Sequence, residues 1–129
     1  MFGNIYHNKK VLITGNTGFK GTWLTAWLLK LGAKVVGFSK DVPTIPSAFE
    51  ILKLRDKITY YQEDIRSADK VKQTFLNEKP DFIFHLAAQA IVSQSHQRPL
   101  ETLETNILGT ANILEALRSI NWPCTAVII

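Results

Sequence analysis

Three glycines, Gly15, Gly18 and Gly21, stand three residues apart in the stretch VLITGNTGFKGTWLTAWLLKLG. A glycine costs a helix stability relative to alanine, so three within seven positions require a reason in the backbone. A β-branched apolar run precedes them and a strongly apolar helix pattern follows. A glycine-rich turn between a strand and a helix can surround a phosphate with backbone N–H groups. The stretch therefore predicts a binding site for a pyrophosphate.

Each glycine of this turn has its own expected role. Gly15 permits the tight turn, Gly18 lets the backbone approach the phosphates, and Gly21 allows the helix to pack against the strand. Lys20 falls in the first helical turn, where its charge opposes the helix dipole unless a phosphate lies nearby. As structural alternatives, Lys20 could simply point into solvent, and the glycines could simply form a tight turn between strand and helix.

The rest of the chain alternates between strand and helix patterns. Runs rich in Val, Ile, Phe and Tyr predict five strands, at Val11–Thr14, Lys34–Phe38, Ile58–Tyr61, Asp81–Leu86 and Thr125–Ile129. Helix patterns lie between them, at Phe19–Leu31, Ser47–Leu54, Ser67–Glu78 and Pro99–Ile120, with Gly32 as the left-handed end of the first. This alternation predicts an α/β fold, a doubly wound parallel sheet of the Rossmann type that stops at its fifth strand. In the last helix, helical spacing predicts a buried face formed by Leu103, Ile107, Leu114 and Leu117.

Composition narrows the class of protein. The chain has 129 residues and 14.5 kDa, with 46% hydrophobic and 20% charged residues, as in a soluble globular domain. No apolar run approaches the roughly 18 residues of a membrane span, and the first ten residues lack the apolar stretch of a secretory signal. The single cysteine, Cys124, excludes an internal disulfide and favours a cytoplasmic location. The net charge of +4 is spread between acids, which favours a solvated surface over a nucleic-acid patch.

Four motifs in order carry a family resemblance: GNTGFKG, QEDIR, FHLAAQ and ETNILGTANILEALR. Together they resemble the extended short-chain dehydrogenase/reductase family of nucleotide-sugar enzymes. Within that family, GNTGFKG followed by VPTIPSAFE and HLAAQAIVSQSHQRPLETLETN is similar to the 4,6-dehydratase branch that acts on CDP-glucose for deoxysugar and lipopolysaccharide synthesis. The resemblance covers essentially the whole chain and implies NAD as the cofactor, a nucleotide-sugar substrate, and no metal.

The resemblance also implies roles for particular residues. Asp64 would accept from the adenine amino group while the backbone of Ile65 reads the ring edge, although Asp64 could instead cap the turn toward Ser67. Ala87 and Ala88 leave room for a nucleotide against the backbone, or simply pack in the core. The cofactor-binding set is Gly15, Thr17, Gly18, Phe19, Lys20, Gly21, Ser39, Lys40, Asp64, Ile65, Leu86, Ala87, Ala88 and Thr105, and the substrate-binding pair is Gln89 and Ser93.

One position departs from the family pattern. About eighteen residues after Gly21, many relatives place an acid that binds the ribose hydroxyls, whereas this chain has Ser39, Lys40 and then Asp41. A serine followed by a lysine also suits a ribose 2′-phosphate, so these residues leave NADP open, while the resemblance favours NAD. His85 is predicted to be an interior histidine and not a catalyst.

The catalytic group of the family is expected beyond Ile129. Family members use a Ser or Thr and a Tyr-x-x-x-Lys pair after the fifth strand, and no residue follows that strand here. We therefore expect an incomplete NAD-binding domain from the N-terminal part of a larger enzyme, inactive alone. The family pairs its subunits through the long helix, so Leu100, Leu108 and Ile113 predict a homodimer or larger parent. The alternatives are a nucleotide-sugar epimerase or reductase of the same family, or a non-catalytic dinucleotide-binding module.

Overall fold

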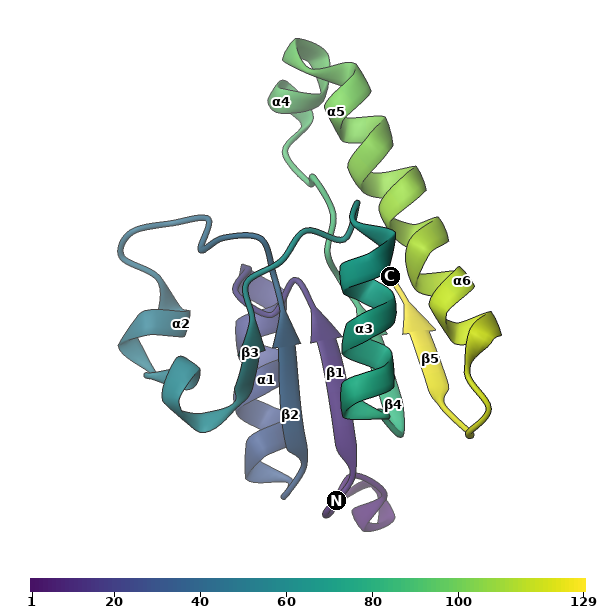
Figure 1. The fold of residues 1–129 in the computed structure, drawn as a ribbon. Coiled ribbons are helices and arrows are strands. Elements are labelled where there is room, and N and C mark those ends of the chain that lie inside the picture. The colour runs from purple at the N-terminus through teal and green to yellow at the C-terminus, as the bar shows by residue number, and fades with distance from the viewer.

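A computed structural model describes residues 1–129 and joins five strands in one parallel sheet (Figure 1). The sheet order is β3-β2-β1-β4-β5, so the chain starts in the middle and winds outward in both directions. The strands are β1 (Lys10–Thr14), β2 (Lys34–Phe38), β3 (Thr59–Tyr61), β4 (Phe82–His85) and β5 (Thr125–Ile128). The predicted doubly wound fold is confirmed. Because all strands are parallel, their carboxyl ends meet at one edge of the sheet.

Helices connect the strands and cover both faces of the sheet. They are α1 (Phe19–Lys30), α2 (Ala48–Ile51), α3 (Ala68–Glu78), α4 (Val92–Gln97), α5 (Pro99–Leu103) and α6 (Gly109–Ser119). Two 3₁₀ turns are η1 (Phe2–Asn4) and η2 (Leu54–Lys57), and a π-helical turn, η3 (Glu104–Leu108), joins α5 and α6 into one long helix. No helix has both the length and the apolar character needed to cross a bilayer.

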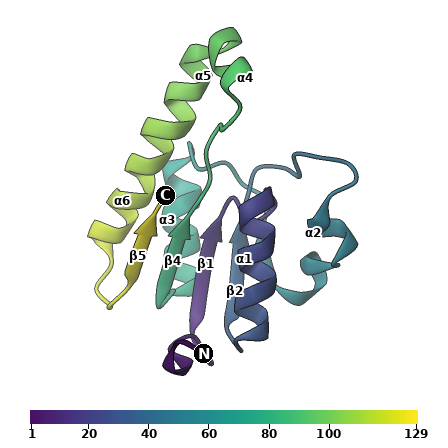
Figure 2. The ribbon, with the colours of Figure 1, turned by 180° about the vertical axis from the view of Figure 1, so that it is seen from behind.

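Two apolar layers hold the helices to the sheet. On the face seen in Figure 1, α3 and α6 pack over a core that includes Phe38, Phe75 and Ile113. On the face seen in Figure 2, α1 packs over a smaller core, in which Leu28 meets Val11 and other strand residues. Each such side chain contributes roughly 1.5–3 kcal/mol by leaving water. The two layers fix the strand ends from which the site is built.

The helix ends follow local sequence signals. Gly32 has φ +81° and donates its N–H to Leu29 O, so it is the predicted left-handed end after α1. Ser47 precedes α2, and its hydroxyl accepts from Glu50 N at 3.2 Å. Ser67 is the N-cap residue of α3, as predicted, without a side-chain bond to the helix.

The buried face of the long helix differs from the prediction. The expected core residues Leu103, Ile107 and Leu114 are at least half exposed, while Leu117 is only partly buried. The buried positions are Gly109, Ile113 and Ala116, although the sequence placed Ile113 on the outer side. The buried positions all lie in α6, which packs on the sheet, whereas α5 and η3 extend past the carboxyl ends of the strands (Figure 1). The first half of the long helix therefore has no sheet to pack on.

Candidate nucleotide-binding site

The three glycines of the turn after β1 have different surroundings. Gly15 has φ +72°, and a Cβ placed there would lie 2.8 Å from Ala87 N. A Cβ on Gly21 would collide with Gly15 O. A Cβ on Gly18 would meet only Gly15 O, at an ordinary 3.5 Å. The fold itself therefore requires glycine at the outer two positions, whereas Gly18 borders open space.

The open side of Gly18 coincides with the start of α1. Gly18 is the N-cap residue of this helix, no side chain caps it, and no acid lies in the first turn. The N–H groups of a first turn have no helical partner, and they carry the positive end of the helix dipole. Phe19 is 81% exposed, and Lys20 is exposed without an ion pair. These features fit an anion such as a pyrophosphate.

A buried hydrogen-bond network joins the glycine turn to the end of β2. Asn16 is fully buried, and its Oδ1 accepts from Ser39 Oγ at 2.7 Å. Thr17 N donates to the same Ser39 Oγ at 3.4 Å, and Thr17 Oγ1 donates to Asp41 O at 2.6 Å. Gly37 has no Cβ where the Asn16 amide lies. Ser39 is thus 5% exposed beneath the turn, while Lys40 is exposed at the mouth of the site.

The loop after β3 holds a carboxylate in a fixed position. Asp64 Oδ1 accepts from Arg66 N at 2.9 Å, and Asp64 Oδ2 accepts from Arg66 Nη2 at 2.7 Å. These bonds to Arg66 lower the pKa of Asp64, so the carboxylate is charged at neutral pH. Ser67 N donates to the backbone oxygen of Asp64, not to its carboxylate. The side chain of Ile65 is buried in the core, while its N–H finds no acceptor within the protein.

At the end of β4, His85 is buried between two hydroxyls. Thr110 Oγ1 gives its hydrogen to Asn106 O at 2.7 Å, so it accepts from His85 Nε2 at 3.0 Å. His85 Nδ1 then accepts from Thr14 Oγ1 at 2.6 Å, and Thr14 Oγ1 itself accepts from Ala87 N at 3.2 Å. Burial lowers the pKa of His85, which favours this neutral form. The structure places the histidine in the interior, as predicted.

The loop after β4 is also clamped from the long helix. Asn106, in η3, accepts from Gln89 N at 2.8 Å and donates to Gln89 O at 3.1 Å. The Gln89 side chain donates to Thr102 Oγ1 at 3.1 Å and accepts from Ile91 N. Of the other predicted residues, Thr105 is half-buried beside Asn106, and Ser93 is exposed on α4. The role of Gln89 and Ser93 toward a sugar stays a prediction.

The four strand ends bring most of the predicted residues together. Gly15 lies against Ala87, which continues from Leu86 and leads into Ala88. Thr17 meets Ser39, and Lys40 Nζ lies 3.9 Å from Asp64 Oδ2.

Sequence reasoning missed three positioning residues. Asn16, Arg66 and Asn106 all stand inside motifs that the sequence marked as similar to a family. Their types were the available signal, since Asn and Arg side chains bond readily to nearby backbone and carboxylate groups.

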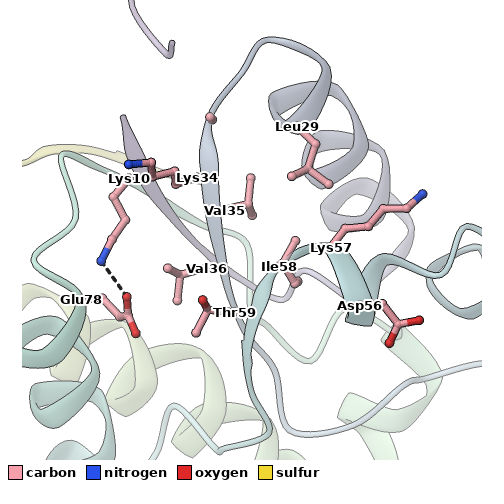
Figure 3. A pocket seen from close by; sticks show the side chains of 11 residues that line it. Lys10, Leu29, Lys34, Val35, Val36, Asp56, Lys57, Ile58, Thr59 and Glu78 are labelled. Atoms are coloured by element: carbon pink, nitrogen blue, oxygen red, sulfur yellow. Dashed lines mark hydrogen bonds and ion pairs between the residues drawn. The ribbon is translucent and has the colours of Figure 1, made fainter. Parts of the chain in front are cut away.

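A separate hollow of about 570 Å³ lies at the amino ends of β1, β2 and β3, opposite the glycine turn; Figure 3 shows its lining. Its lining includes Lys10 and Glu78, which pair at 2.9 Å. Lys10 also follows Tyr6 by four residues, the spacing of the family's catalytic pair. Tyr6, however, packs on Phe82 with ring centroids 5.1 Å apart, at the far end of the sheet from the glycine turn. The hollow is therefore not the predicted nucleotide site. No cluster of side chains suited to a metal ion occurs in the structure.

Comparison with known proteins identifies the family of this chain. Residues 12–128 match the family described as GDP-mannose 4,6 dehydratase. The chain belongs to this family. CDP-glucose 4,6-dehydratase of Salmonella typhimurium is 43% identical over 117 residues, which are 91% of this chain and 33% of that protein. The resemblance predicted from the motifs is confirmed.

Solved structures agree with this family assignment. UDP-glucose 4-epimerase of Thermus thermophilus, solved in complex with NAD, is 31% identical with a TM-score of 0.75. The match covers 84% of this chain and 33% of the epimerase chain. Pal from Bacillus thuringiensis is 30% identical with a TM-score of 0.80 and covers 92% of this chain and 38% of its own. The chain thus spans about a third of the length of the relatives that it matches. NAD in a solved relative agrees with the predicted cofactor.

Proposed function

We propose that the chain is the NAD-binding part of a nucleotide-sugar 4,6-dehydratase that acts on CDP-glucose. The observation that carries this proposal is the open flank of Gly18 above the uncapped start of α1. A dinucleotide needs such a place for its pyrophosphate, at the carboxyl edge of the sheet. The identity of 43% to a CDP-glucose 4,6-dehydratase supports the choice of substrate, and the NAD in a solved relative supports the choice of cofactor.

Different residues of the site would bind different parts of the cofactor. The backbone from Gly18 to Lys20 would hold the pyrophosphate, and the charged Asp64 would accept from the adenine amino group beside the free N–H of Ile65. Ala87 and Ala88 would let the nucleotide lie against the end of β4. When bound, NAD supplies a hydride acceptor for the sugar. Thr105, Gln89 and Ser93 would then face the nicotinamide and sugar side.

The remaining expectations concern the parent enzyme. The tyrosine–lysine base would be supplied by chain that is not among these residues, and the enzyme would work in the cytoplasm on deoxysugar precursors. A homodimer would use the apolar side chains that the long helix exposes: Leu100, Leu103, Ile107 and Leu108. Ile113, which the sequence assigned to this contact, is excluded because it is 1% exposed in the core.

Calorimetric titration of NAD into the 129-residue chain tests the proposal. We expect weak binding of NAD and ADP, little affinity for CDP-glucose, and no keto-sugar absorbance in base after incubation with both. The binding is expected to be weak because these residues contact only the adenosine and pyrophosphate end. Absence of NAD binding by a folded chain would contradict the proposal, and keto-sugar formation would contradict the assignment of the base elsewhere. An epimerase or a binding module would also bind NAD, so the parent's turnover of CDP-glucose separates these alternatives.

A further inference from the structure

We infer that Glu101 selects NAD over NADP by pairing with Lys40 at the ribose end of the site. The inference rests on the proposed function, since it concerns the same dinucleotide site. It answers the question that Ser39 and Lys40 leave open in the sequence. Neither residue is the acid by which doubly wound domains usually bind the ribose hydroxyls of NAD.

Of the residues at the end of β2, Ser39 and Lys40 would by themselves favour a 2′-phosphate. The hydroxyl of Ser39 is buried and bonded to Asn16 and Thr17, so it does not reach solvent. Lys40 follows directly, with a side chain that is 56% exposed. A free ammonium group at this position would attract the additional negative charge of NADP.

The ammonium group of Lys40 is not free, because two carboxylates flank it. Its Nζ lies 3.9 Å from Asp64 Oδ2 and 4.0 Å from Glu101 Oε1. Asp64 is itself fixed by Arg66, whereas Glu101 comes from α5, far along the chain. α5 lies in the part of the long helix that extends past the carboxyl ends of the strands (Figure 1), and the ion pair with Lys40 places its Glu101 at the site.

The charges of the whole cluster are paired, so no cation in it is left without a carboxylate. Arg66 also faces Glu104, with Nη1 3.6 Å from Oε2. Glu101 also pairs with Arg98, whose Nη1 lies 3.5 Å from Glu101 Oε2. Three cations, Lys40, Arg66 and Arg98, therefore face three carboxylates, those of Asp64, Glu101 and Glu104. A 2′-phosphate would have to compete with Glu101 for Lys40, whereas a neutral ribose hydroxyl has no need of that cation. Glu101 thus replaces, from another element, the discrimination that an acid after β2 usually gives.

Titration of NAD and NADP into the 129-residue chain and its variants tests the inference. We expect Glu101→Gln to raise NADP affinity about fivefold at low salt, with NAD affinity unchanged within about twofold. Glu104→Gln is the matched control. It removes the same charge from the same long helix, but the carboxylate that it removes pairs with Arg66 and not with Lys40. We expect it to change the NADP/NAD ratio less than about twofold. In a Lys40→Met background, Glu101→Gln should give no gain in NADP affinity beyond that of the control.

The outcomes separate the inference from the proposed function. An unchanged NADP/NAD ratio in a Glu101→Gln variant that binds NAD overturns the inference and leaves the proposed function standing. An equal gain in Glu104→Gln also overturns it, since the effect would then be a general field and not the pairing with Lys40. If the wild-type chain is folded by circular dichroism and binds neither nucleotide, the proposed function fails and the inference fails with it.

Discussion

The turn after β1 and the loop after β4 lie side by side, and side-chain hydrogen bonds hold both, but only the turn also has a strict steric limit. The turn requires glycine, because neighbouring backbone atoms leave no room for a Cβ at Gly15 or Gly21. The loop depends on added polar groups, because Thr14 and Asn106 bond to its backbone at Ala87 and Gln89. A shape that depends on steric contacts can be read from residue types, whereas one that depends on hydrogen bonds requires the partners' positions.

The largest effect is expected where the turn is most crowded. Gly21→Ala would drive its Cβ into Gly15 O and to within 2.7 Å of Asn16 Cα, and neither backbone atom can move without opening the turn. We expect the free energy of unfolding to fall by about 3 kcal/mol, as for severe overpacking. Urea denaturation followed by circular dichroism measures this change. A loss smaller than that of Asn106→Ala would invert the comparison between the two regions.

In the loop after β4, removal of the clamp should cost less. Asn106→Ala leaves the N–H and the carbonyl of Gln89 without their partner, for a loss of about 2 kcal/mol. Hydrogen exchange at the Gln89 amide should also become faster while the amides of β1 keep their protection. Asn106→Asp is the matched control, because its carboxylate can still accept from Gln89 N but cannot donate to Gln89 O. Slow exchange at Gln89 in the alanine variant would show that the clamp does not hold this loop.

A smaller effect is expected from pH, through His85. Burial lowers the pKa of the folded histidine below its ordinary value of 6.5, so the unfolded chain binds the proton more tightly. This contribution to stability is complete above pH 6.5 and falls as the pH decreases toward the lowered folded pKa. The slope is at most about 1.4 kcal/mol per pH unit, the value for one proton. His85→Gln should lose this part of the pH dependence, and equal slopes in both proteins between pH 7 and 5 would contradict the assignment.

The same contrast explains what could be predicted from the sequence. The strands, the glycine turn and the end of α1 at Gly32 follow from local patterns, so they were found within a residue or two. The bond between Thr14 and His85 arises from the register of β1 with β4, which pairs these two residues across the sheet. The burial of Ile113 depends on tertiary context as well, because it results from the packing of α6 on the sheet. Neither feature has a local signal.

Gly18 is proposed to serve a bound ligand and not the fold, and the substitution Gly18→Val separates these two roles. In Gly18→Val, the new Cβ has space and φ is −73°, so the protein should keep its circular dichroism spectrum and its unfolding midpoint. The side chain would occupy the position where a pyrophosphate must approach the backbone. We expect calorimetry to detect NAD binding to the wild-type chain and none to the variant. Unchanged NAD affinity in a folded Gly18→Val protein would contradict this expectation.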